Sequence, residues 1–214
     1  MRPHVIVYNA TTVDGRTTGF EADLATYYGI ASEWTIDAIL VGADTFLLSG
    51  EGFDLADQIP SKKPRPKEGQ LMVIPDSKGR IKNIKMLRDS EYWGDVIILC
   101  SKSTPRSHIE YLKKRSIEYF VAGSNHVDLA AALDYLAEKH DVKTVRVDNG
   151  GKLNGALLRT GLVDEVVTLI HPQVVGDAPH STMFRFPQGA DGVGTISLKL
   201  ESVKKVGKGL VLIR

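Results

Sequence analysis

Val145-Arg-Val-Asp-Asn-Gly-Gly-Lys-Leu-Asn-Gly-Ala-Leu-Leu-Arg159 is the stretch of the chain that decides its fold. Val145 and Val147 alternate with polar residues, which is typical of the end of a half-buried strand. The turn at Asn149-Gly-Gly151 follows it. A stripe of apolar residues then predicts a helix that stops at Gly161. The members of the stripe are Leu153, Ala156, Leu157 and Leu158.

A strand, a double glycine and a helix start together predict a cradle for an anion. Glycines let the backbone approach a ligand closely, and the first helical N–H groups and the helix dipole favour negative charge. The pyrophosphate of a dinucleotide fits this description. The spacing matches neither G-x-G-x-x-G nor the P-loop, because Lys152 is followed by Leu153. A turn that uses glycine only for its geometry and binds nothing stays open on spacing alone.

Length and charge limit the classes of protein. The 214 residues predict one domain, 1–214. The net charge is +1, from 27 basic and 26 acidic residues, so no global electrostatic attraction to nucleic acid or an anionic membrane is expected. No apolar run approaches the ~20 residues of a membrane helix. A strand is expected directly after Met1-Arg-Pro-His4, so we expect no secretion signal.

Cys100 is the single cysteine, so an intramolecular disulfide is impossible and a reducing cytoplasm is expected. It ends the apolar run Val96-Ile-Ile-Leu-Cys100 and is expected to be a buried strand residue. The six histidines show no i, i+4 pairing and no H-E-x-x-H motif, so no metal site is predicted. His171, before Pro172, is interpreted as a strand-end residue.

Strands and helices are expected to alternate along most of the chain. The last two expected strands form an antiparallel pair, and Thr104 is expected to cap the helix that begins at Pro105. This order predicts an α/β fold with a mostly parallel sheet, helices on both faces and an antiparallel C-terminal edge. The expected strands are 4–9, 37–42, 70–74, 95–100, 118–121, 142–147, 165–170, 195–200 and 209–213, and the expected helices are 20–34, 43–48, 105–115, 129–137 and 152–160.

Polar turns follow several of these strands. If the strands are parallel, the turns share one rim of the sheet and converge on one ligand. They are Thr12 to Arg16, Ser77, Ser101 to Thr104, and Asp148 to Gly151.

The block Asn149-Gly-Gly-Lys-Leu-Asn-Gly-Ala-Leu-Leu-Arg-Thr-Gly-Leu-Val-Asp-Glu165, followed by His171-Pro-Gln-Val-Val-Gly176, resembles the pyrimidine reductases of riboflavin biosynthesis. That family comprises the reductase domain of the bifunctional bacterial deaminase-reductase and its stand-alone archaeal relatives. Thr12-Val-Asp-Gly-Arg16 and Asp37-Ala-Ile-Leu-Val-Gly-Ala-Asp-Thr45 resemble two further family motifs, and Asp76-Ser77 resembles its strand-end serine.

The resemblance implies a dihydrofolate-reductase-like fold, NADPH as hydride donor, a phosphoribosylamino-pyrimidine substrate whose ribosyl group becomes ribityl, and commonly a homodimer. Asp148 is expected against the substrate, and Asp14 in the loop that covers the nicotinamide. These two carboxylates are the catalytic candidates, because a carboxylic acid can deliver a proton as the sugar ring opens. The expected cofactor contacts are Thr12, Thr45, Ser77, Gly150, Gly151, Lys152, Leu153, Asn154, Gly155 and Ala156.

The chain departs from the family on the substrate side. Glu33-Trp34 replaces an Arg-Ala, and Ser49-Gly-Glu-Gly-Phe-Asp-Leu-Ala56 replaces Asp-Asp-Pro-x-Leu-Thr-x-Arg. Those arginines are expected to grip a substrate phosphate. Lys62, Lys63 and Arg65 are candidates to replace them, and Ser77, Lys78, Arg80 and Lys102 are candidates for the cofactor 2′-phosphate.

Two other functions stay open from the sequence. One keeps the fold and NADPH but reduces another pterin-like, carbonyl or imine compound. The other is a nucleotide-binding protein that senses the cofactor without catalysis. A deaminase motif of the type H-x-E…P-C-x-x-C is missing from the sequence, so the chain is not expected to deaminate.

Overall fold

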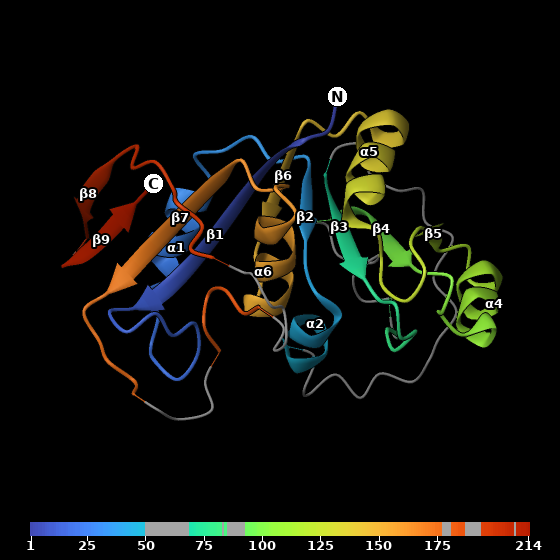
Figure 1. Ribbon diagram of the computed structural model, residues 1–214, viewed down its shortest axis with the longest axis horizontal. Helices are drawn as coiled ribbons and strands as arrows, with labels where there is room; N and C mark the ends of the chain where they lie inside the picture. The colour runs from blue at the N-terminus through green and yellow to red at the C-terminus, as the bar shows by residue number, and fades with distance from the viewer. Residues whose placement is uncertain (50–68, 83, 85–92, 177–180, 187–193, 208) are drawn as a thin grey trace. The chain divides into compact units, whose positions relative to one another are not determined.

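A computed structural model describes residues 1–49, 69–82, 84, 93–176, 181–186, 194–207 and 209–214 (Figure 1). These residues form two compact units. Unit 1 is Met1–His4 with Ile36–Arg146, and unit 2 is Val5–Thr35 with Val147–Arg214. The elements are β1 (His4–Thr12), α1 (Leu24–Ala31), β2 (Ala38–Leu40), α2 (Ala43–Ser49), β3 (Gln70–Pro75), β4 (Trp93–Cys100), α4 (Arg106–Lys114), β5 (Glu118–Val121), α5 (Leu129–His140), β6 (Thr144–Val147), α6 (Gly151–Arg159), β7 (Glu165–His171), β8 (Val203–Val206) and β9 (Leu210–Ile213).

Unit 1 contains the strand order β5-β4-β3-β2-β6. The pairs β2–β3, β3–β4 and β4–β5 are all parallel. Six consecutive residues of β4 are buried, as expected for a parallel strand covered on both faces. Cys100 is one of them and is fully buried, which confirms the prediction for this residue; burial raises the pKa of its thiol to about 12.

Helices α4 and α5 of unit 1 each bury one face. In α5 the buried residues are Ala132, Leu133 and Leu136, and the Asp128 carboxylate caps the helix by accepting from the Ala131 N–H. Figure 1 shows α5 in front of β3 and β4. The predicted cap at Thr104 was wrong. Pro105 is the N-cap of α4, because the Thr104 hydroxyl instead donates to the carbonyl of Ser77.

Unit 2 contains the strand order β1-β7-β9-β8. The pair β1–β7 is parallel, whereas β7–β9 and β8–β9 are antiparallel. The predicted strand at 195–200 was wrong, because the strand that pairs with β9 is β8. Residues 194–200 are all exposed and have no backbone partner among the described residues. Their alternating apolar residues therefore have no neighbouring strand within the part of the chain that the structure describes.

Consecutive residues of β1 contact different helices. The ring of Tyr8 stacks on Tyr27 of α1 with 4.3 Å between centroids, and the amide of Asn9 bonds to Asn154 of α6. Because successive side chains of a strand point to opposite faces, α1 and α6 lie on opposite faces of β1, as Figure 1 shows. Helix α1 is shorter than the predicted 20–34.

The predicted α/β architecture is confirmed: the described residues form nine strands, mostly parallel, flanked by helices and finished by antiparallel C-terminal strands. Within the described ranges, no helix has the length and apolar composition that crossing a membrane requires.

Candidate functional site

Three asparagines fix the turn between β6 and α6. The Asn9 side-chain amide donates to the carbonyl of Asn149 at 2.8 Å. Nδ2 of Asn154 donates to Oδ1 of Asn9 at 2.8 Å and to the carbonyl of Met183 at 2.9 Å, and Asn154 is fully buried. Buried donors that are bonded in this way favour one arrangement, although Oδ1 of Asn154 has no partner among the described residues. The turn that carries Gly150 is therefore held against β1.

The N-terminus of α6 differs from those of two other helices. Asp23 caps α1 and Asp128 caps α5 with a carboxylate. Helix α6 begins after Gly150, and no side chain of the described residues caps it; its first turn also lacks an acidic residue. The first N–H groups of a helix favour an anion. The start of α6 therefore fits a phosphate group without competition from a capping carboxylate.

Gly151 and Gly155 face the chain's own segment 181–186. A Cβ at Gly151 would overlap the carbonyl of Thr182 and lie 3.0 Å from Cβ of Arg185, and one at Gly155 would overlap the Arg185 carbonyl. The Arg185 N–H donates to the Gly151 carbonyl at 2.9 Å. Both glycines are thus needed for close packing of the backbone, a requirement that the sequence did not reveal.

Asp148 lies directly after β6 and is partly buried. Its Oδ1 accepts a hydrogen bond of 3.0 Å from the hydroxyl of Tyr27 on α1. The sequence reasoning missed Tyr27 and Asn9, because each is more than a hundred residues away along the chain from its partner in this turn.

Asp14 is engaged by three donors. The Thr12 hydroxyl donates to its Oδ1 at 2.5 Å, the Gly176 N–H donates to Oδ2 at 2.8 Å, and the Val175 N–H donates at 3.3 Å. These bonds, the Thr12 hydroxyl first, lower the pKa of Asp14 to about 2. The carboxylate is ionised and connects the loop after β1 to the segment after β7.

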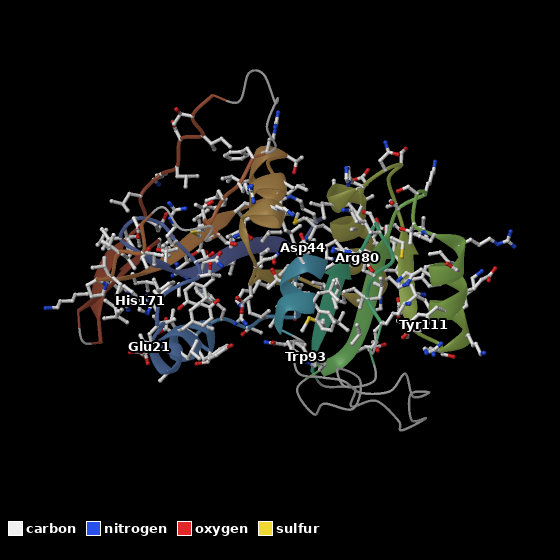
Figure 2. The ribbon with its side chains drawn as sticks, turned by 90° about the horizontal axis from the view of Figure 1, so that it is seen from below. Glu21, Asp44, Arg80, Trp93, Tyr111 and His171 are labelled. Carbon is white, nitrogen blue, oxygen red and sulfur yellow. The ribbon has the colours of Figure 1, made fainter. Side chains whose placement is uncertain are left out.

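His171 ends β7 and is buried, which confirms it as a strand-end residue. Its Nε2 accepts from the Asp23 N–H at 2.9 Å, so Nδ1 carries the proton and donates to the Leu169 carbonyl at 3.2 Å. Nearby, the Gln173 amide donates to the carbonyl of Glu21, which Figure 2 labels together with His171. His171 therefore positions the start of α1.

Thr45 and Ser77 belong to unit 1. Thr45 lies in the first turn of α2, beside Asp44, which pairs with Arg80 at 2.7 Å; the two side chains point toward one another in Figure 2. The Ser77 hydroxyl accepts from the Val127 N–H at 3.0 Å. The Asp44–Arg80 pair thus joins α2 to the turn after β3.

The remaining expectations concern the basic residues for a substrate phosphate and a metal site. Lys62, Lys63 and Arg65 lie outside the described residues. Among the residues that the structure does describe, no group of three or more His, Cys, Asp or Glu side chains has the geometry to hold a metal ion.

Comparison with known proteins covers almost the whole chain. The model of the family described as RibD C-terminal domain matches residues 3–212. The 2,5-diamino-6-ribosylamino-4(3H)-pyrimidinone 5′-phosphate reductase of Methanothermobacter thermautotrophicus is 31% identical over 99% of this chain and 97% of its own length.

Solved structures show the same fold. A pyrimidine reductase-like protein from Corynebacterium diphtheriae is 18% identical, with a TM-score of 0.70 over 99% of this chain and 90% of its own. RibD from Acinetobacter baumannii is also 18% identical, with a TM-score of 0.67 over 99% of this chain. This chain spans 57% of the length of that RibD chain. The expected dihydrofolate-reductase-like fold is confirmed.

Proposed function

The chain belongs to the RibD C-terminal domain family, and from this membership we propose that it is the NADPH-dependent reductase of a riboflavin precursor. The substrate is 2,5-diamino-6-ribosylamino-4(3H)-pyrimidinone 5′-phosphate or its deaminated counterpart, 5-amino-6-(5-phosphoribosylamino)uracil. The observation that carries the proposal is the 31% identity to a reductase of the first compound over nearly the full length of both chains. Residues 1–214 are one reductase domain in this proposal.

The residues of unit 2 fit a dinucleotide. The uncapped start of α6 suits its diphosphate, and Asn154 fixes the turn from which Gly150, Gly151, Lys152 and Leu153 would contact it. Thr12, Gly155 and Ala156 complete the proposed cofactor contacts in this unit, and Thr45 and Ser77 are those of unit 1. The 2′-phosphate of NADPH would be held from the Ser77 turn, by Lys78 or Arg80, or by Lys102.

The bound nicotinamide would supply the hydride that reduces C1′ of the ribosyl group. The chain's own part is to orient the sugar, exclude water and move protons. As the ring opens, the C1′–O4′ bond breaks, O4′ takes a proton and a C=N bond forms. Asp148 delivers that proton. The nitrogen keeps its hydrogen, so the open form is an iminium ion, and hydride addition at C1′ alone would complete the neutral ribitylamine.

The two carboxylates have different roles in this proposal. Asp14, with a pKa of about 2 and three donors on its oxygens, is a poor proton donor near neutral pH. It contributes by holding the loop at 12–16 in place over the nicotinamide. Asp148, which accepts from the Tyr27 hydroxyl, is left as the acid.

The test is turnover by the purified chain with NADPH and each of the two pyrimidines, followed by loss of nicotinamide absorbance and formation of the ribityl product. NADH serves as the control for the 2′-phosphate. Asp148→Asn is expected to lose turnover and keep NADPH binding. Cofactor binding without turnover of either pyrimidine would overturn the proposal and favour a sensor.

A second candidate is reduction of a different carbonyl or imine compound by the same fold. The substitutions at Glu33-Trp34 and 49–56 favour it, because they remove arginines expected to bind a substrate phosphate. The second candidate predicts that kcat/KM is higher for dephosphorylated pyrimidines or unrelated imines than for the phosphorylated pyrimidines.

We also propose that the protein is a cytoplasmic homodimer. Segment 194–200 exposes Ile196, Leu198 and Leu200 at alternate positions, with exposed fractions of 39%, 60% and 64%. Antiparallel pairing with a second copy about Leu198 places Leu198 against Leu198 and Ile196 against Leu200, so the segment is complementary to itself. Edge strand β8, with its exposed Lys204 and Lys205, is protected against such pairing.

Light scattering after gel filtration tests the dimer. Leu198→Lys is expected to yield monomers, whereas Val13→Lys, at another exposed apolar side chain, is expected to leave the dimer intact. A wild-type chain that stays monomeric at micromolar concentration would refute this assembly.

A further inference from the structure

The hydroxyl of Tyr27 has two acceptors. It lies 3.0 Å from Oδ1 of Asp148 and 3.1 Å from the carbonyl oxygen of Tyr8. A tyrosine hydroxyl carries one proton and can donate only one hydrogen bond at a time. The proton therefore points either to the carboxylate or to the backbone carbonyl.

The ring that carries this hydroxyl is fixed. Tyr27 is 5% exposed and stacks on Tyr8, with 4.3 Å between centroids and an interplanar angle of 5°. The Tyr8 hydroxyl donates in return to the Tyr27 carbonyl at 3.1 Å. The two tyrosines therefore hold each other at both ends, and the Tyr27 oxygen keeps its position while its proton is free to rotate.

Two further aromatic side chains contact this pair. Trp34 contacts the edge of Tyr8 at 5.1 Å, and Tyr28 contacts the edge of Tyr27 at 5.3 Å. The guanidinium of Arg214 lies over the ring of Trp34, 5.5 Å from its centroid. Among the described contacts of the two tyrosines, Asp148 is the carboxylate that the Tyr27 hydroxyl reaches.

We propose that Tyr27 is a positioning residue for Asp148: its proton points to Oδ1 while Asp148 is ionised and turns to the Tyr8 carbonyl when Asp148 is protonated. The hydroxyl is bonded in both states, so neither state leaves a buried donor unsatisfied. This inference rests on the proposed role of Asp148 as the acid.

Tyr27→Phe removes the hydroxyl and keeps the stacked ring. A hydrogen bond to the ionised form of an acid favours that form. Its loss is therefore expected to raise the pKa of Asp148 by about one unit, a tenfold change in proton affinity. The pKa is measured by NMR titration of the labelled carboxyl carbons, with Asp148→Asn assigning the signal. This readout needs no substrate.

The kinetic readout is the pH profile of kcat. We expect Tyr27→Phe to lower kcat about tenfold, which corresponds to loss of one hydrogen bond to a charged group, and to leave KM for NADPH unchanged. One limb of this pH profile reports the protonation of Asp148 and should be absent in Asp148→Asn. In Tyr27→Phe, that limb should move to higher pH. Tyr28→Phe, on the neighbouring exposed ring, is the matched control and should change none of these quantities.

The outcomes separate this inference from the proposed function. Wild-type turnover with an Asp148 signal that titrates identically in Tyr27→Phe would overturn the inference and leave the reductase assignment standing. If the wild type turns over neither pyrimidine, the proposed function fails, and the NMR titration still decides whether Tyr27 controls the protonation of Asp148. A fall in thermal stability of Tyr27→Phe without a shift of the titration would also refute it, because that indicates a purely structural hydroxyl.

Discussion

Nδ2 of Asn154 on α6 donates a hydrogen bond of 2.8 Å to Oδ1 of Asn9 on β1, and both amides are buried. The same Nδ2 lies 2.9 Å from the carbonyl of Met183, so one side chain holds a strand, a helix and the segment 181–186 together. A buried network of this kind costs most when one member is removed, because its partners lose their bonds without regaining water.

Asn154→Ala is therefore expected to reduce the free energy of unfolding by about 3 kcal/mol, since it leaves at least two buried acceptors unpaired. Denaturant unfolding measures the change. Arg159→Ala, at an exposed position of the same helix, is the control and should stay within about 0.5 kcal/mol of wild type. An Asn154→Ala protein as stable as the control would show that the network contributes little.

Gly155→Ala tests the packing of α6 on segment 181–186. Alanine in a helix interior is ordinarily favourable by up to about 1 kcal/mol over glycine. Here the added methyl group would meet the backbone of Arg185, so we expect a loss of about 2 kcal/mol instead. Gly29→Ala in α1, where nothing lies within 4 Å of the new Cβ, is the matched control and should stabilise the protein. If both substitutions changed the free energy of unfolding in the same direction, the close approach of Gly155 to the Arg185 backbone would be contradicted.

His108 predicts a loss of stability in mild acid. Its ring is buried and, among the described residues, makes no hydrogen bond; Nε2 lies 3.7 Å from Asp76. Burial lowers the pKa of His108 below the ordinary 6.5. Below that pH the unfolded chain takes up a proton that the folded chain resists, so stability present above about pH 6.5 falls as the pH decreases toward the folded pKa.

The measurement is chemical unfolding between about pH 7 and about pH 5, the range in which an unfolded histidine titrates. His108→Gln removes the titrating group and should flatten the dependence. A variant with the slope of the wild type would assign the effect to other groups.

Asp14 predicts a second, more acidic transition. Its pKa is about 2 in the folded protein against an ordinary value of 3.8, so its contribution is present above about pH 4 and is lost as the pH falls toward 2. At neutral pH, Asp14→Asn should speed hydrogen exchange of the Val175 and Gly176 amides, because their acceptor loses its charge. Asp23→Asn, which removes a carboxylate that caps α1, should leave those two amides as they are.

The sequence predicted what is encoded locally. The buried run Val96 to Cys100 and the glycine turn after Asp148 are each visible within a few residues, and both elements are where the pattern placed them. The C-terminal hairpin was misplaced because Ile196, Leu198 and Leu200 alternate more clearly than Val203-Lys-Lys-Val206, although only the latter pairs with β9.

The contacts of the candidate site could not be predicted from local sequence patterns, because the residues that make them are far apart along the chain. Asn9 meets Asn149 across 140 positions, and Tyr27 meets Asp148 across 121. Neither residue carries a signal in its own surroundings: Asn9 ends an apolar run, and Tyr27 has an equivalent neighbour in Tyr28. Only the folded chain shows which tyrosine is buried against the carboxylate.

Cys100 gives this protein a built-in reporter. Its thiol is fully buried at the end of β4, and burial holds its pKa near 12, so a maleimide or disulfide reagent at neutral pH finds almost no accessible thiolate in the folded chain. Since the sequence contains a single cysteine, each labelling event records one opening of the core of unit 1. Comparing the labelling rate with and without a saturating ligand would therefore reveal binding even for a compound that is never turned over.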